Sequence, residues 1–153
     1  MTWVQEGIFA GGGEALPRAW ADFAAQTGIT AVLHLRPSTP MPFLGPSPAS
    51  YLWLSLDDEE LAGPEERWLA GTFIADCLRH GRRVLLHAAR GRHRTRWAFV
   101  AYHICRGAAA HVALRRAAAP PWMAPYHTDR QAWELFAVEV QRRQADAPAE
   151  ARR

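Results

Sequence analysis

Apolar positions along the chain follow two spacings, one typical of strands and one typical of helices. Short apolar runs at residues 29–35 (ITAVLHL), 51–56 (YLWLSL) and 84–87 (VLLH) predict strands. The first run is continuous and rich in β-branched residues, which is typical of a strand buried on both faces. Residues 3–10 predict a short strand or hairpin arm that closes at the three glycines 11–13.

Apolar residues at helical spacing occupy most of the chain between and after these runs. Pro17 and Pro64 suit the first turns of two helices, and Gly28 and Gly81 suit their ends. Further helices are expected over about 95–106, over a stretch that stops before Pro120, and over 129–143.

Strands that alternate with helices predict an α/β protein, with a central, mostly parallel sheet and helices on both faces. We expect a single domain over residues 1–145 and a frayed tail over 146–153. The proline-rich segment 36–50 predicts a loop that serves as a lid or a rim. Ligands of such sheets bind beyond the carboxyl ends of the strands, so the segment after VLLH is the first place to look for a site.

Composition limits the class of protein. The chain has 153 residues, of which 49% are hydrophobic, enough for one core. Apolar runs are too short to cross a bilayer, and the N-terminus lacks a secretory pattern. Cys77 and Cys105 fall in helical segments and are interpreted as buried and reduced, which favours the cytoplasm. All 18 basic residues are arginine, so a Walker-type nucleotide loop, which needs lysine, is excluded.

The segment 87–95 (HAARGRHRT) has the features of an anion-binding loop. A short loop between a buried strand and a helix N-terminus directs several backbone N–H groups to one point, where the helix dipole is positive. Gly91 permits a tight turn, and Arg94 can hold two oxygens of one phosphate with its planar guanidinium. Thr95 places a hydroxyl beside the loop. These residues predict an oxyanion cradle.

The same segment resembles the signature of protein tyrosine and dual-specificity phosphatases, His-Cys-x-x-Gly-x-x-Arg-Ser/Thr, because His87, Gly91, Arg94 and Thr95 match in register. The resemblance implies the cysteine-phosphatase fold over most of the chain and hydrolysis of phosphate monoesters through a phosphocysteine. It implies that His87 orients the loop and that Thr95 assists release of the phosphoenzyme. It also implies a set of phosphate-binding residues: His87, Ala89, Arg90, Gly91, Arg92, His93 and Arg94.

Ala88 stands where the resemblance places the nucleophilic cysteine. Alanine cannot attack phosphorus, so the chain as written is expected to be inactive. Cys77 and Cys105 lie on other parts of the chain and are not substitutes. Either the chain is an engineered variant of an active phosphatase, or it is a native pseudophosphatase. A non-catalytic module that binds or senses a phosphorylated ligand is the alternative function.

Asp57 and Asp58 are the candidates for the general acid that the resemblance implies. They follow the strand YLWLSL, and 88 − 57 places Asp57 31 residues before the nucleophile position. The adjacent carboxylates of Asp58, Glu59 and Glu60 would raise the pKa of the acid. The alternative interpretation is an acidic first turn that stabilises the next helix. Between the two aspartates, Asp57 is preferred.

Arginine is dense around the loop, at positions 90, 92, 94 and 96. We expect a strongly positive mouth and a polyanionic phosphorylated ligand, such as an inositol phosphate, a phosphoinositide or a nucleotide. Binding to nucleic acid is disfavoured because the loop lacks interleaved aromatic residues. A metal is not expected, since His87 has no His or Cys partner at ligand spacing, and no organic cofactor is implied. At position 96 this chain has arginine, where many bacterial members of the phosphatase families that it resembles have glycine.

Overall fold

The computed structural model describes residues 1–13, 19–36, 43, 45–88 and 92–147. Its five strands form one sheet in the order β1-β2-β5-β3-β4. The strands are β1 (Thr2–Gln5), β2 (Ile8–Gly12), β3 (Ile29–Leu35), β4 (Ser50–Leu54) and β5 (Arg83–Ala88). β1 and β2 form an antiparallel hairpin, and β2, β5, β3 and β4 are parallel. This confirms the predicted mostly parallel sheet.

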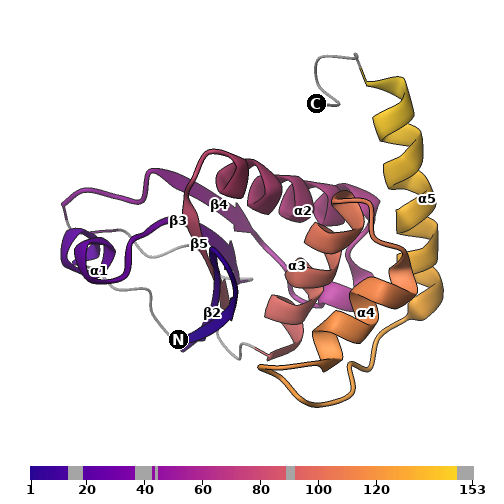
Figure 1. Ribbon diagram of the computed structural model, residues 1–153, viewed down its shortest axis with the longest axis horizontal. Coiled ribbons are helices and arrows are strands. Elements are labelled where there is room, and N and C mark those ends of the chain that lie inside the picture. The colour runs from indigo at the N-terminus through magenta and orange to yellow at the C-terminus, as the bar shows by residue number, and fades with distance from the viewer. Residues whose placement is uncertain (14–18, 37–42, 44, 89–91, 148–153) are drawn as a thin grey trace.

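Helices cover both faces of the sheet, as predicted (Figure 1). On one face lies α1 (Trp20–Thr27), which ends at Gly28 in the left-handed conformation. The other face carries the remaining helices: α2 (Pro64–Arg79), α3 (Arg92–Cys105), α4 (Ala110–Ala118) and α5 (Arg130–Asp146). A short 3-10 helix, η1 (Glu59–Leu61), joins β4 to α2.

Alternation along the central strands divides the buried side chains between two cores. In β5, Leu86 and Ala88 pack in the larger core with α2 and α3, whereas Leu85 packs with Trp20 of α1. In β3, Leu33 and Leu35 face the larger core and Val32 faces α1. Successive side chains of a strand point to opposite faces, so the two central strands are buried on both sides.

Residues 3–10, predicted as one strand or hairpin arm, contain parts of both β1 and β2, and β2 continues through Gly11 and Gly12. Two further boundaries that border the site differ from the sequence pattern. The strand predicted over 51–56 ends at Leu54, because the N–H of Leu56 turns back to the Leu54 carbonyl at 3.0 Å. The helix predicted from Thr95 already begins at Arg92, directly after Gly91. Pro17 and most of the predicted proline-rich rim and tail lie outside the described residues.

The buried interior contains both cysteines and several tryptophans. Cys77 and Cys105 are buried free thiols, as predicted, and burial raises the pKa of Cys105 to about 12. Trp20, Trp97 and Trp133 are core residues, with at most 3% of each exposed. Within the described part of the chain, no helix combines the length and the hydrophobicity that a membrane crossing requires.

Candidate functional site

The candidate site lies at the carboxyl end of β5, the central strand of the sheet. Ala88 is the last residue of β5, is fully buried, and pairs with Gly12 of β2 and Leu35 of β3. The helix α3 begins only four positions later, at Arg92. A strand that ends at Ala88 and a helix that begins at Arg92 agree with the order predicted for the anion-binding segment. The predicted phosphate-binding residues Ala89, Arg90 and Gly91 lie outside the described residues.

Arg94 connects the loop to the acidic segment after β4. Its Nη2 donates to the backbone carbonyl of Asp57 at 2.8 Å, and its Nε lies 3.5 Å from Oε2 of Glu59. Both side chains are sheltered, with 22% of Arg94 and 14% of Glu59 exposed. The segment 87–95 and the acidic segment 57–60, which the sequence analysis identified separately, are therefore in direct contact.

The acidic residues of this segment have different roles. Asp58 caps η1, since its Oδ1 accepts from the N–H of Glu60 at 2.9 Å. For Asp58, the interpretation as part of a stabilising acidic turn therefore applies. Asp57 is exposed, and its side chain is not used as a cap. The sequence treated Glu59 only as a nearby like charge, whereas the structure makes it the ion-pair partner of Arg94.

Glu60 fastens the same segment to the start of α5. Its Oε2 accepts from the Thr128 hydroxyl at 2.9 Å and from the N–H of Asp129 at 3.1 Å. The Thr128 hydroxyl in turn accepts from Nε1 of the buried Trp133 at 2.9 Å. Because Glu60 is held in this way, the position of Asp57 three residues earlier is restrained without a contact to its own carboxyl group.

His87 is the penultimate residue of β5 and pairs with a second histidine. Its Nδ1 is 3.2 Å from Nδ1 of His34, the residue opposite it in the parallel register of β5 and β3. The rings stack, with centroids 5.1 Å apart. Burial lowers the pKa of each to about 4, and the charge of Arg36 adds to the effect. Both rings are thus neutral near pH 7, and one Nδ1 donates to the other.

His34 is a residue that the sequence analysis missed. Its signal was a single imidazole in an otherwise apolar strand, ITAVLHL, but its partner could not be named without the strand register. The described residues contain no group of three or more His, Cys, Asp or Glu side chains that could hold a metal ion.

Arg96 corrects the predicted cluster of four arginines at the mouth. Only 2% of it is exposed, and its Nη1 donates to the carbonyls of Ala124 at 3.2 Å and Pro125 at 3.0 Å. The reason is geometric. Arg94 and Arg96 both lie in α3, and residues two apart point to different sides of a helix. Arg96 therefore holds the loop that precedes α5 and does not contribute to a positive mouth.

The first turn of α3 also contains three other predicted site residues, Arg92, His93 and Thr95. Thr95 is 1% exposed, so its hydroxyl is inside the protein at the helix start. His93 is exposed, and its ring centroid lies 6.4 Å from that of Tyr126. Taken with Arg94, these positions place the start of α3, the end of β5 and the η1 segment around one location. That arrangement can hold a tetrahedral anion at a helix N-terminus.

Comparison with known proteins gives no match to a family model and none to a curated protein by sequence. Solved structures do match over nearly the whole chain. A mouse putative dual specificity phosphatase complexed with zinc tungstate has a TM-score of 0.70 and 19% identity, covering 96% of this chain and 91% of that one. Human DUSP28 has a TM-score of 0.68 and 19% identity, covering 96% and 100%.

A third structure is PTPMT1 in complex with PI(5)P, with a TM-score of 0.72 and 14% identity, covering 92% of this chain and 96% of that one. These identities are low, so the likeness concerns the course of the backbone. The chain has the fold of the dual-specificity and tyrosine phosphatases.

Proposed function

We propose that this chain binds phosphate monoesters in the loop 87–95 at the end of β5 and, as written, does not hydrolyse them. The observation that carries the proposal is the position of Arg94. It extends from the first turn of α3 to the segment after β4, where the resemblance places the general acid. In the phosphatase fold, that is the side chain expected to grip the phosphate.

In the proposed complex, the phosphate replaces Glu59 as the anionic partner of Arg94. The backbone N–H groups of the loop and the N-terminus of α3 add their partial positive charge. A dianion with several oxygens can satisfy both the guanidinium and the amides, whereas one carboxylate 3.5 Å from Nε cannot. Phosphate binding therefore releases Glu59.

Turnover would need a nucleophile, and Ala88 provides none. The two thiols of the chain do not replace it, because both are buried and burial raises the pKa of each. With cysteine at position 88, Asp57 would act first as general acid and then as base, and Thr95 would assist release of the phosphoenzyme. The chain is then either an engineered variant or a native pseudophosphatase. The free thiols favour a reducing compartment such as the cytoplasm.

The test is Ala88→Cys assayed with a generic aryl phosphate. We expect turnover that Arg94→Ala abolishes, since the guanidinium binds the transferring group. Failure of the unaltered chain and of Ala88→Cys to bind inorganic phosphate would overturn the proposal. Retained phosphate binding without turnover in Ala88→Cys would instead favour the second function, a phospho-ligand sensing module. Its supporting observation is that Ala88 is packed in the larger core with no exposed surface.

A further inference from the structure

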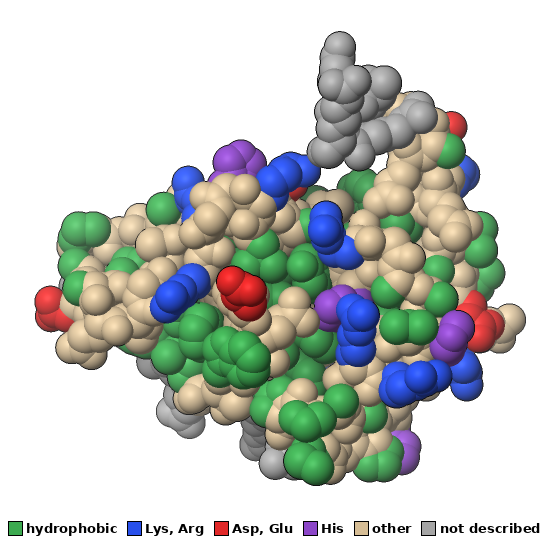
Figure 2. Space-filling view, viewed as in Figure 1, with side chains coloured by type: hydrophobic (Ala, Val, Ile, Leu, Met, Phe, Trp, Pro, Cys, Tyr) green, Lys and Arg blue, Asp and Glu red, His purple; other side chains and the backbone are tan. Residues whose placement is uncertain are grey.

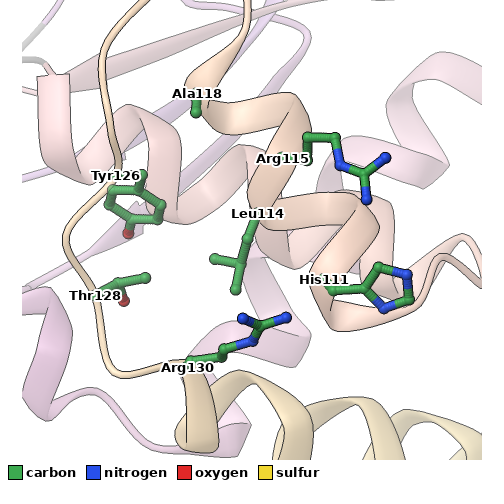
Figure 3. Close-up of a pocket in the computed structure, with 7 residues that line it drawn as sticks. All are labelled: His111, Leu114, Arg115, Ala118, Tyr126, Thr128 and Arg130. Atoms are coloured by element: carbon green, nitrogen blue, oxygen red, sulfur yellow. The ribbon is translucent and has the colours of Figure 1, made fainter.

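A cavity with basic side chains in its lining has Tyr126, the ring neighbour of His93, in its wall. A groove of about 500 Å³ is lined by residues of α4, by the segment before α5 and by the start of α5 (Figure 3): His111, Leu114, Arg115, Ala118, Tyr126, Thr128 and Arg130. Its volume falls within the range of small-molecule pockets. Figure 2 shows arginine and histidine side chains gathered over α4 and the chain leading into α5.

The charged groups of the groove come from two helices. His111 and Arg115 are four residues apart in α4 and project from one face. Figure 3 shows the guanidinium of Arg130 extending from the start of α5 toward α4. Among the described lining residues none is acidic. Three basic side chains therefore line one cavity, and the nearest acidic groups are Glu60, bonded to Thr128, and Glu134, paired with Arg130.

The two arginines are available to a ligand to different degrees. Arg115 is exposed and makes no ion pair with another described residue. The Nε of Arg130 lies 3.5 Å from Oε1 of Glu134, in a pair with 66% and 60% of the side chains exposed. Exposed pairs of this kind are weak, so a phosphate dianion can displace Glu134.

Tyr126 relates the groove to the first turn of α3. It lines the groove, and its ring centroid lies 6.4 Å from that of His93, the residue before Arg94. The cation of Arg96 lies 5.8 Å from the same ring and is bonded to the Ala124 and Pro125 carbonyls, which fixes this wall. The wall of the groove that Tyr126 forms therefore lies next to His93 in the first turn of α3.

We propose that this groove is a second anion subsite, which takes a further phosphate of a small polyphosphorylated ligand whose first phosphate is held at Arg94. The inference deepens the proposed function and rests on it. His111, Arg115 and Arg130 bind the second phosphate, Leu114 packs against the carbon skeleton of the ligand, and Tyr126 separates the two sites. A ligand with one phosphate leaves the groove unused.

The experiment is calorimetry at physiological ionic strength with inositol 1-phosphate and inositol 1,4,5-trisphosphate as probes. We expect the trisphosphate to bind the unaltered chain about tenfold more tightly or better. The Arg115→Ala/Arg130→Ala variant is expected to lose that advantage and keep its affinity for the monophosphate. The matched control is Arg79→Ala/Arg142→Ala, which removes two exposed arginines that do not line the groove and should behave as the unaltered chain.

A site-specific readout accompanies the titrations. The side-chain NMR signals of His111 should move with the trisphosphate and not with the monophosphate. Equal loss of trisphosphate affinity in the control variant, or no loss in the groove variant, overturns the second subsite while monophosphate binding at Arg94 stands. Absence of monophosphate binding by the unaltered chain overturns the proposed function and the link between the two sites.

Discussion

The guanidinium of Arg94 lies 3.5 Å from the carboxylate of Glu59, and both side chains are largely shielded from water. The side chain proposed to hold phosphate is therefore already paired with an internal anion. A ligand must break that pair, and the carboxylate must find water or another donor. If Arg94 holds phosphate as proposed, we expect Glu59 to lower the affinity for it, and the same pair keeps Arg94 extended toward the η1 segment.

Removal of this carboxylate should strengthen anion binding. We expect Glu59→Gln to raise the affinity for inorganic phosphate several-fold in calorimetric titration, because the ligand no longer competes with a charged partner. Glu65→Gln is the matched control, since Glu65 also pairs with an arginine, Arg143 at 2.7 Å, but lies on α2. A loss of affinity in Glu59→Gln would show that orientation of Arg94 outweighs competition.

Asp57 and Asp58 should differ in their effects. In the Ala88→Cys background, Asp57→Asn is expected to lower kcat/KM for an aryl phosphate by about 10²–10⁴, the usual contribution of a general acid. Asp58→Asn should leave it nearly unchanged, because asparagine also caps helices well. The pH profile of kcat/KM is the second readout. The alkaline limb, on which activity falls as the general acid loses its proton, should vanish only in Asp57→Asn. The reverse pattern would assign the acid to Asp58.

The contact between Glu60 and Thr128 should contribute to stability and to the site together. Glu60→Ala is expected to lower the free energy of unfolding by about 1–3 kcal/mol, since it leaves the N–H of Asp129 and the Thr128 hydroxyl without their acceptor. Denaturant unfolding measures the loss. Thr128→Ala combined with Glu60→Ala should cost less than the sum of the two single changes, and full additivity would contradict the proposed coupling.

The neutral histidine pair predicts how stability depends on pH. The pKa values of His34 and His87 are about 4 in the folded chain and near 6.5 when unfolded, so the unfolded state binds more protons between these values. The free energy of unfolding should therefore fall as the pH drops from 6.5 toward 4. His103, with a folded pKa of about 4, acts in the same direction. His34→Gln should make the fall shallower, and an unchanged slope would contradict the assignment.

Local pattern was enough for most of the fold. The run ITAVLHL forms β3 over the predicted residues, and Pro64 opens α2 as expected, because burial and first-turn chemistry are encoded within a few residues. The contacts within the candidate site could not be predicted from local pattern in the same way. His34 and His87 are 53 residues apart in the sequence, and their pairing depends on the register of β3 and β5, which no local pattern contains.

The error at Arg96 has a similar origin. With a helix predicted from Thr95, Arg94 and Arg96 were grouped on one mouth; because α3 begins at Arg92, the two side chains diverge. The partnership of Arg94 with Glu59 was also hidden, since it requires the η1 turn to place one carboxylate of several toward α3. The segment 87–95 and the acidic segment after β4 could thus be identified from the sequence, whereas the contacts between them could not.

The most direct measurement is a crystal structure of the unaltered chain grown with inorganic phosphate, together with phosphate titration of Arg94→Ala. We expect a phosphate at the end of β5, within hydrogen-bond distance of the Arg94 guanidinium and of backbone N–H groups before α3, with Glu59 displaced. We also expect Arg94→Ala to lose phosphate binding. A phosphate bound elsewhere, or equal affinity in Arg94→Ala, would contradict the central claim.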